Sequence, residues 1–498
     1  MLVITKVIPL MVWKIDTSDM WSHLYDAKQI KRGKKIPKSL NKFFPEVQFT
    51  YPYGISYILS LINEKQRKPL FLTINLLLHG IEVLTASLLV YKIVGIEYLY
   101  VAVAAYICWP KFFLPWTGLY GISARVIGAV ICNINIISFI LYYESSEYLY
   151  LIIPFLTSPL LILFSKFSVQ VTIIYIIFLS FYYQSLIPIS IIFVSFIIFN
   201  ILLKNELFKI LKGHLLHSVF YFKYLQKSHI ATTKRTKSLI EFLISFTNIS
   251  NKKSLFLLLY HTPCIRILLF NPFLILILSF YISEESYVFE IFDYLLIYSL
   301  SLCFIFSYSK LRFIGEADRY FTFSTTIITA IILSKILKHD QSYLYPLIIL
   351  LIFSFLISVS IIIFKCVKKK TVDINSSKEV AYYLDNNIDT VNNIIVSPQN
   401  ITEKIIYFSK CTFVGMHTNI TSNIKEWNIY YSLFKKTFPF VSCEIEYLKK
   451  ELNVKYFVVS KHYLCNSYLE TYDLSLSDVT KPTKNNVFEN KDYIIYEL

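Results

Sequence analysis

The sequence predicts an α-helical polytopic membrane protein of about 10 to 12 spans that ends in a small soluble α/β domain. Hydrophobic residues make up 55% of the 498 residues and charged residues only 16%, which is more apolar surface than a single soluble core could bury. The apolar residues lie in long runs such as Tyr345 to Phe364, and the composition turns polar after Lys370. A membrane domain is therefore expected over residues 1–366 and a soluble domain over 371–498.

The apolar runs are expected to be helices, because hydrocarbon offers backbone amides no partner outside their own helix. The expected spans cover roughly residues 70–93, 97–113, 121–142, 148–165, 168–184, 187–203, 266–283, 289–308, 320–337 and 344–365.

The N-terminal apolar segment, Met1 to Trp13, is shorter than the ~20 residues that a helix needs to cross a bilayer. Two interpretations stay open: a short or mis-assigned start, and a half-inserted helix. No small-residue cleavage site follows, so a cleavable signal peptide is not expected.

Two polar segments interrupt the membrane domain. Residues 15–54 begin with carboxylates and continue with apolar residues at helical spacing, which predicts an exterior loop carrying a helix that lies on the membrane surface. Residues 204–265 form a basic, amphipathic loop. In the soluble domain, Ser376 to Asn387 reads as a helix, and Asn393–Val396, Lys455–Val459 and Asp492–Leu498 read as strands.

The net charge of +16 comes from lysines and arginines between the spans, which is how membrane proteins carry their orienting charge. The expected partner is therefore the lipid bilayer, and no nucleic acid. Five of the eight cysteines lie in or beside the expected spans and show no CxxC or Cys/His spacing, so no zinc site is expected.

Two carboxylates, Asp16 and Asp19, directly follow the first apolar segment, with His23 one turn further on. A carboxylate at a membrane interface can orient a hydroxyl or amide and accept its proton, and two within three residues can share a divalent cation. The alternative is that these acids cap the helix that follows.

The second candidate constellation is the segment from Lys310 to Tyr320, between two apolar runs. Arg319 can hold a lipid phosphate with two hydrogen bonds, and Tyr320 adds a hydroxyl. An interfacial anchor of Arg and Tyr is the alternative, but anchoring requires no acid such as Glu316.

Arg125 is the third candidate, because it follows a segment that two prolines and two glycines keep from being helical and lies just inside the next span. An arginine at membrane depth usually faces a cavity or an acidic partner.

This pattern resembles the GT-C superfamily of membrane glycosyltransferases, which includes oligosaccharyltransferases and protein mannosyltransferases. The matching elements are Asp16 to Asp19, the stretch DMWSHLYDAKQIKRGKKIP, the turn YPYG and the late loop GEADRY, while the terminal VFENKDYIIYEL is similar to the end of the soluble domain of some prokaryotic members. The resemblance spans the whole chain in architecture and about 40 residues in motifs.

The resemblance implies that a sugar moves from a polyprenyl- or dolichyl-phosphate-linked donor to a glycan, lipid or protein acceptor on the exterior face. Asp16 would be the catalytic acid group with Asp19 assisting. The donor and substrate would be held by residues from all three candidates: Arg319, Tyr320, Glu316, Arg125 and His23. No acid lies between Trp109 and Arg125, where oligosaccharyltransferases carry a metal-binding motif, so a divalent cation is allowed but not required.

The family orientation puts the C-terminal domain and GEADRY outside the cell membrane. It also puts the basic loop outside, against the positive-inside rule, which weakens for long loops. Two other functions stay open: a transporter or flippase of lipid-linked sugars, which is expected to show pseudo-symmetric halves, and a non-enzymatic envelope assembly subunit.

Overall fold

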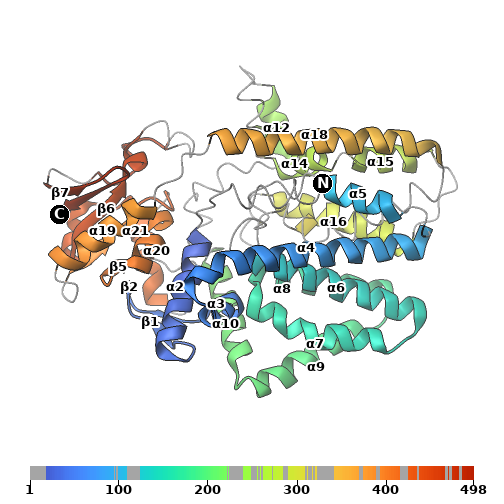
Figure 1. Ribbon diagram of the computed structural model, residues 1–498, viewed down its shortest axis with the longest axis horizontal. Helices are drawn as coiled ribbons and strands as arrows, with labels where there is room; N and C mark the ends of the chain where they lie inside the picture. Colours follow the sequence, from blue (N-terminus) through green and yellow to red (C-terminus); the bar gives the residue numbers. More distant parts are fainter. Residues whose placement is uncertain are drawn as a thin grey trace. The chain divides into compact units, whose positions relative to one another are not determined.

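The structure is a computed structural model, shown in Figure 1. It describes residues 18–94, 96, 99–108, 124–220, 222–223, 239–247, 255, 258–259, 262–271, 273–283, 290–308, 311, 317, 320–321, 341–368, 374–388, 393–415, 424–434, 437–465, 469, 474–481 and 485–498.

The chain divides into two compact units that interleave along the sequence. The helical unit comprises Met1–Ile15, Lys65–Leu207 and Lys237–Lys369. The α/β unit comprises Asp16–Glu64, Phe208–Thr236 and Lys370–Leu498. The compact unit that contains the C-terminal tail therefore also contains the loop that follows the first apolar segment.

The helical unit is built mainly from apolar helices. Its described helices are α4 (Glu64–Val94), α5 (Leu99–Cys108), α6 (Ala124–Ser145), α7 (Leu149–Phe164), α8 (Lys166–Tyr182), α9 (Ile187–Leu202), α12 (Leu239–Phe246), α14 (Pro263–Phe270), α15 (Phe273–Ser283), α16 (Ile291–Ser307), the 3₁₀ helix η7 (Gln341–Tyr343) and α18 (Leu344–Lys368). Helices α6 to α9 follow one another with short turns and pack together, as Figure 1 shows.

Helices α6 and α8 approach each other closely at small residues. A Cβ atom placed on Gly128 of α6 would lie 2.2 Å from Ser168 Oγ and 2.6 Å from Ser165 Cβ. Ser165 is the N-cap of α8 and accepts a hydrogen bond from the backbone N–H of Ser168. Glycine and serine at this crossing therefore allow the two backbones to come near, as they do at many membrane helix interfaces.

Large apolar side chains cover the outside of several of these helices. Examples are Phe181, which is 79% exposed, and Ile201 and Leu202 of α9. Among the described residues, α6 is the one helix long and apolar enough to cross a membrane, and a second span results if α9 and α10 (Glu206–Phe220) form one broken span. The predominantly helical fold is thus confirmed, while the 10 to 12 spans stay a prediction.

The α/β unit is organised around a six-stranded sheet. Its strand order is β2 (Phe43–Phe44), β5 (Thr412–Val414), β4 (Ile394–Val396), β6 (Val454–Ser460), β8 (Tyr493–Glu497) and β7 (Asn485–Glu489). The first four strands are parallel, and β8 and β7 add an antiparallel edge. A separate antiparallel pair joins β1 (Ser39–Leu40) to β3 (Val47–Gln48).

Apolar side chains are buried on both faces of this sheet, as expected for parallel strands. On one face, Phe413 and Ile395 pack with Val458 and with Trp21 of α2 (Ser18–Gly33). On the other face, Phe457 and Val459 pack in a second core. The described helices of the unit are α2, α3 (Gly54–Ser60), most of α10, α19 (Ile374–Asn387), α20 (Gln399–Phe408), α21 (Ile424–Phe434), α22 (Ile445–Lys450) and the 3₁₀ helix η8 (Lys461–Leu464).

The strands and the helix predicted in the tail are all present. Helix α19 and strands β4, β6 and β8 match the predicted segments within two residues at each end. The small α/β architecture at the C-terminus is therefore confirmed.

The loop after the first apolar segment contributes a strand to the sheet. Phe43 and Phe44 form β2 and pair in parallel with Phe413 and Val414 of β5. The backbone N–H of Phe413 donates to Lys42 O at 2.9 Å. In Figure 1 this part of the sheet is blue, beside the orange and red tail.

Candidate functional site

The structure describes the predicted site residues unequally. Asp16, Glu316 and Arg319 lie outside the described residues. Asp19 is in the first turn of α2, where the backbone alone is described. No group of three His, Cys, Asp or Glu side chains that could hold a metal ion occurs within the described part of the chain.

Helix α2 presents His23 to the interior of the α/β unit. The side chain is 2% exposed, and its Nδ1 lies 3.1 Å from Ser56 Oγ of α3. The imidazole ring also packs at 5.7 Å from the ring of Tyr51. The His23 side chain therefore connects α2 to α3 and to the turn that leads into α3.

Helix α2 forms because its apolar residues share one face and its basic residues fall at its end. Trp21 and Tyr25 are buried against the tail, and Lys31 and Arg32 occupy the last turn, where cations favour the helix dipole. The Trp21 ring lies 5.3 Å from Tyr407 and 5.4 Å from Phe408, both in α20. This aromatic packing fixes the helix that begins two residues after Asp16.

Arg125 and Tyr320 belong to the helical unit. Arg125 is the second residue of α6 and is half-buried. Tyr320 is completely buried: its ring stacks on Phe306 at 4.4 Å and meets Phe167 edge-on at 5.0 Å. The aromatic contacts fix the position of the Tyr320 ring, whatever its hydroxyl binds.

A basic cluster that sequence reasoning missed lies where α2 meets the tail. Lys28 Nζ donates to Tyr407 O at 2.8 Å, and Lys42 Nζ donates to Ser409 O. Burial, followed by the nearby charges of Lys28 and Arg32, lowers the pKa of the Lys42 ammonium to about 8.

Asp385 of α19 supplies the negative charge beside this cluster. Its Oδ1 accepts hydrogen bonds from Ser409 Oγ at 2.7 Å and from the backbone N–H of Lys410 at 2.6 Å. Burial raises the pKa of the neighbouring Cys411 thiol to about 11, so this cysteine is an inert thiol at neutral pH. The cluster therefore connects the loop to the tail through hydrogen bonds. Its residues are far apart in the sequence, so no local sequence signal could have shown it.

The carboxyl ends of the parallel strands form a second feature that sequence reasoning missed. After β4 the chain turns directly into α20, and Ser397 Oγ lies 2.7 Å from Thr402 Oγ1. The backbone N–H of Gln399 donates to Pro439 O at 2.9 Å. Because β5 and β6 lie on opposite sides of β4, the strand order reverses here, and open α/β sheets bind ligands at such a point. In the sequence, the short polar run after a predicted strand is the signal that could have indicated this feature.

No protein-family model matches the sequence, and no curated protein sequence matches it. Three similar solved structures are of oligosaccharyltransferase from the archaeon Archaeoglobus fulgidus. The structure of that enzyme, AglB, with an inhibitory peptide and a dolichol-phosphate matches with a TM-score of 0.51 and 11% identity, over 96% of this chain and 71% of that one.

The other two structures match this chain equally broadly. The complex with zinc and sulfate has a TM-score of 0.50 and 11% identity, over 96% of this chain and 70% of that one. The form tethered by a disulfide bond to an acceptor peptide with an NVT sequon has a TM-score of 0.52 and 12% identity, again over 96% and 70%. The predicted resemblance is confirmed at the level of fold: the chain has the fold of the archaeal oligosaccharyltransferase, a member of the GT-C superfamily.

Proposed function

We propose that this protein is a membrane glycosyltransferase that moves a sugar or glycan from a polyprenyl- or dolichyl-phosphate-linked donor to an acceptor on the exterior face of the membrane. The observation that carries the proposal is the fold match over 96% of the chain to an enzyme solved with dolichol-phosphate and with an acceptor peptide. A peptide is therefore the first acceptor to test.

The roles of the site residues follow from their chemistry and the family pattern. Asp16 orients the acceptor nucleophile and accepts its proton, with Asp19 beside it. Arg319 binds the donor phosphate through its planar guanidinium, and Glu316 shares its loop. Arg125, Tyr320 and His23 complete the proposed donor and substrate contacts.

The arrangement of the loop supports a rigid catalytic segment. Helix α2 is locked to the tail by Trp21 and by the Lys28 hydrogen bond, so the residues at its start are attached to a fixed element. Catalytic groups gain most when the supporting structure restricts their positions.

Sugar transfer in isolated membranes tests the proposal. Membranes carrying the wild type, Asp16→Asn, Arg319→Ala or Arg319→Lys are supplied with radiolabelled polyprenyl-phosphate and dolichyl-phosphate sugars and with sequon-containing peptides or native acceptors. We expect the wild type to transfer label and Asp16→Asn to lose at least about 100-fold in rate. Arg319→Lys should recover part of the activity that Arg319→Ala loses, because it keeps the charge but not the paired hydrogen bonds.

Matched controls separate chemistry from general loss of charge. Glu147→Gln removes an exposed acid next to α7, and Lys450→Ala removes an exposed cation on α22. Both should transfer label as the wild type does. Equal transfer by Asp16→Asn and the wild type would instead make Asp16 a helix cap. Parallel reactions with a chelator, and with added Mn²⁺ or Mg²⁺, test whether a divalent cation takes part.

A further inference from the structure

A cavity of about 560 Å³ opens on the α/β unit between α19 and the end of β7. This volume lies within the ~300–1,000 Å³ of typical small-molecule sites. Its lining comes from one face of α19, from the end of β7 and from the first residue of the β7–β8 turn: Lys378, Glu379, Tyr382, Tyr383, Asn387, Phe488, Glu489 and Asn490. None of the residues assigned to sugar transfer lies here.

Aromatic rings form one wall of this cavity. The Tyr383 ring lies 4.7 Å from the Phe488 ring at an interplanar angle of 31°. Tyr382 is a large aromatic residue that lies on the exposed face of α19 and is itself 74% exposed. An exposed tyrosine beside a fixed aromatic pair offers a flat surface on which a ligand can stack.

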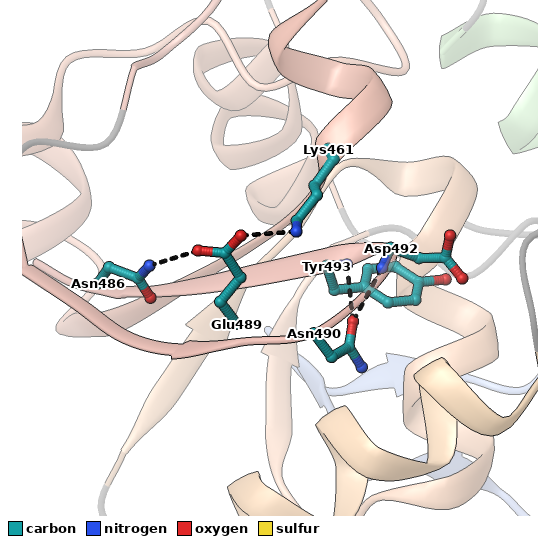
Figure 2. A network of polar contacts seen from close by, with 6 residues as sticks. All are labelled: Lys461, Asn486, Glu489, Asn490, Asp492 and Tyr493. Atoms are coloured by element: carbon teal, nitrogen blue, oxygen red, sulfur yellow. Dashed lines mark hydrogen bonds and ion pairs between the residues drawn. The ribbon is translucent and has the colours of Figure 1, made fainter.

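The polar groups at the β7 end are held in place by their own contacts, as Figure 2 shows. Glu489 Oε1 pairs with Lys461 Nζ at 2.6 Å, and Glu489 Oε2 accepts from Asn486 Nδ2 at 3.0 Å. These contacts lower the pKa of the Glu489 carboxyl, so it stays ionised. Each carboxylate oxygen keeps a second lone pair for a ligand hydroxyl.

Asn490 connects the turn to α19. Its Oδ1 accepts from the backbone N–H groups of Asp492 at 3.0 Å and Tyr493 at 2.9 Å. Its Nδ2 donates to Ser376 O at 2.8 Å and to Glu379 Oε2 at 3.0 Å. Asn490 is thus fully occupied and orients the Glu379 carboxylate, which leaves Glu379 Oε1 at the cavity.

The charges around the cavity balance. Lys378 and Lys461 oppose Glu379 and Glu489, so neither an anion nor a cation is favoured over an uncharged ligand. Apolar ring faces next to planar carboxylate and amide groups suit a pyranose ring, because its C–H face stacks on an aromatic ring while its hydroxyls bond to the rim. A purely apolar ligand would leave these polar groups desolvated.

We propose that this cavity is a binding site for a neutral oligosaccharide, with Tyr382 as the stacking surface and Glu379 and Glu489 as hydroxyl acceptors. Asn387 lies at the far end of α19, where its Oδ1 adds an acceptor; its Nδ2 donates to Tyr383 O at 3.0 Å. The site is separate from the residues proposed for transfer and does not depend on that function.

The test is direct binding by the full-length protein in lipid nanodiscs, because many detergents carry sugar head groups. Saturation-transfer NMR and calorimetry are run with mannotriose, maltotriose and chitotriose, without any donor lipid. We expect at least one of these sugars to bind, and Tyr382→Ala and Glu379→Gln each to weaken binding about tenfold. Tyr431→Ala, which removes an exposed tyrosine from α21, should bind as the wild type does.

Several outcomes would overturn the proposal. They are the absence of binding to all three sugars at millimolar concentration, equal binding by Tyr382→Ala and the wild type, and preferential binding of a lysine-rich peptide used as a charged comparison. A variant counts only if its thermal unfolding matches that of Tyr431→Ala. Because no donor lipid is present, loss of binding and loss of sugar transfer are read independently.

Discussion

Lys28 and Tyr407 join two ends of the chain: the Lys28 ammonium donates a hydrogen bond to the Tyr407 carbonyl at 2.8 Å across a separation of 379 positions. The Lys42 side chain makes the same kind of bond to Ser409, and β2 continues the contact as a strand of the tail's sheet. The loop that carries Asp16 therefore folds with the C-terminal tail as one unit. Disturbing either partner should affect the other.

Phe43→Ala tests this coupling. Phe43 is 1% exposed and lies in the same core as Phe413 and Ile395. Deleting a buried phenylalanine ring typically costs about 3–5 kcal/mol. We expect the Phe413 amide, which donates to Lys42 O, to exchange its hydrogen much faster in the variant, as measured by hydrogen exchange with mass spectrometry.

The matched control for Phe43→Ala is Phe49→Ala, in the same loop. Phe49 lies outside β2 and only borders the core that contains Phe413, so exchange in β5 should change much less than in Phe43→Ala. Protection of Phe413 that survives Phe43→Ala would show that the tail folds without the loop strand.

The lowered pKa of Lys42 gives a pH-dependent prediction. An ordinary lysine titrates near pH ~10.4, whereas Lys42 should be half-deprotonated near pH 8. Competitive acetylation followed by mass spectrometry should show the Lys42 rate reaching half its maximum near pH 8. The acetylation rate of the exposed Lys450, measured in the same sample, serves as the reference for the reactivity of the reagent at each pH. A half-maximum near pH 10 for Lys42 would contradict the burial argument.

The lowered pKa of Lys42 also predicts the direction in which the stability of the fold changes with pH. Because its pKa is lower in the folded state, Lys42 is penalised as a cation there and destabilises the fold below pH 8. Between about pH 8 and 10.5 the unfolded chain binds more protons than the folded one, so stability rises with pH. The charges that face Lys42 are Lys28, Arg32, Asp385 and the Cys411 thiol. Lys42→Met lacks this titration, so the difference in unfolding free energy between the wild type and Lys42→Met should itself rise with pH between about pH 8 and 10.5.

The sequence could predict the centre of the α/β unit but not its edges. Lys455–Val459 reads as a buried strand because parallel strands covered on both faces are continuously apolar. Strand β2 has two residues, and its pairing with β5 depends on a partner far along the chain, so no local pattern shows it. Strand β7 is an edge with mostly exposed residues, which also hides it.

The candidate site shows a similar division. The sequence marks His23 as a polar residue on a predicted helix, and the helix exists, but the contact of His23 with Ser56 arises only when α3 packs on α2. The basic cluster of Lys28, Arg32 and Lys42 needs the whole unit to form. Charge patterns along a sequence show which residues are ionised, whereas tertiary packing decides which of them meet.

Two substitutions of Tyr320 can distinguish a role of its ring in packing from a role of its hydroxyl in binding the donor phosphate. Tyr320→Phe keeps the ring between Phe306 and Phe167 and removes the hydroxyl alone. If the hydroxyl helps to bind the donor phosphate, sugar transfer should fall about tenfold with unchanged thermal stability. Tyr320→Ala should lower both, because it also leaves a cavity. If Tyr320→Phe transfers sugar at the wild-type rate, the role of Tyr320 is limited to packing.

Gly128 and Gly80 form a matched pair of helix glycines in the helical unit. A methyl group on Gly128 would meet Ser168 Oγ at 2.2 Å, and relieving that overlap requires α6 and α8 to separate. Overpacking of this kind typically costs about 1–3 kcal/mol. A methyl group on Gly80 of α4 meets nothing within 4 Å, so there the better helix propensity of alanine should stabilise the fold by up to about 1 kcal/mol. Thermal unfolding of both variants in one detergent should therefore move in opposite directions, and a shared direction would mean that α6 and α8 are not in close contact at Gly128.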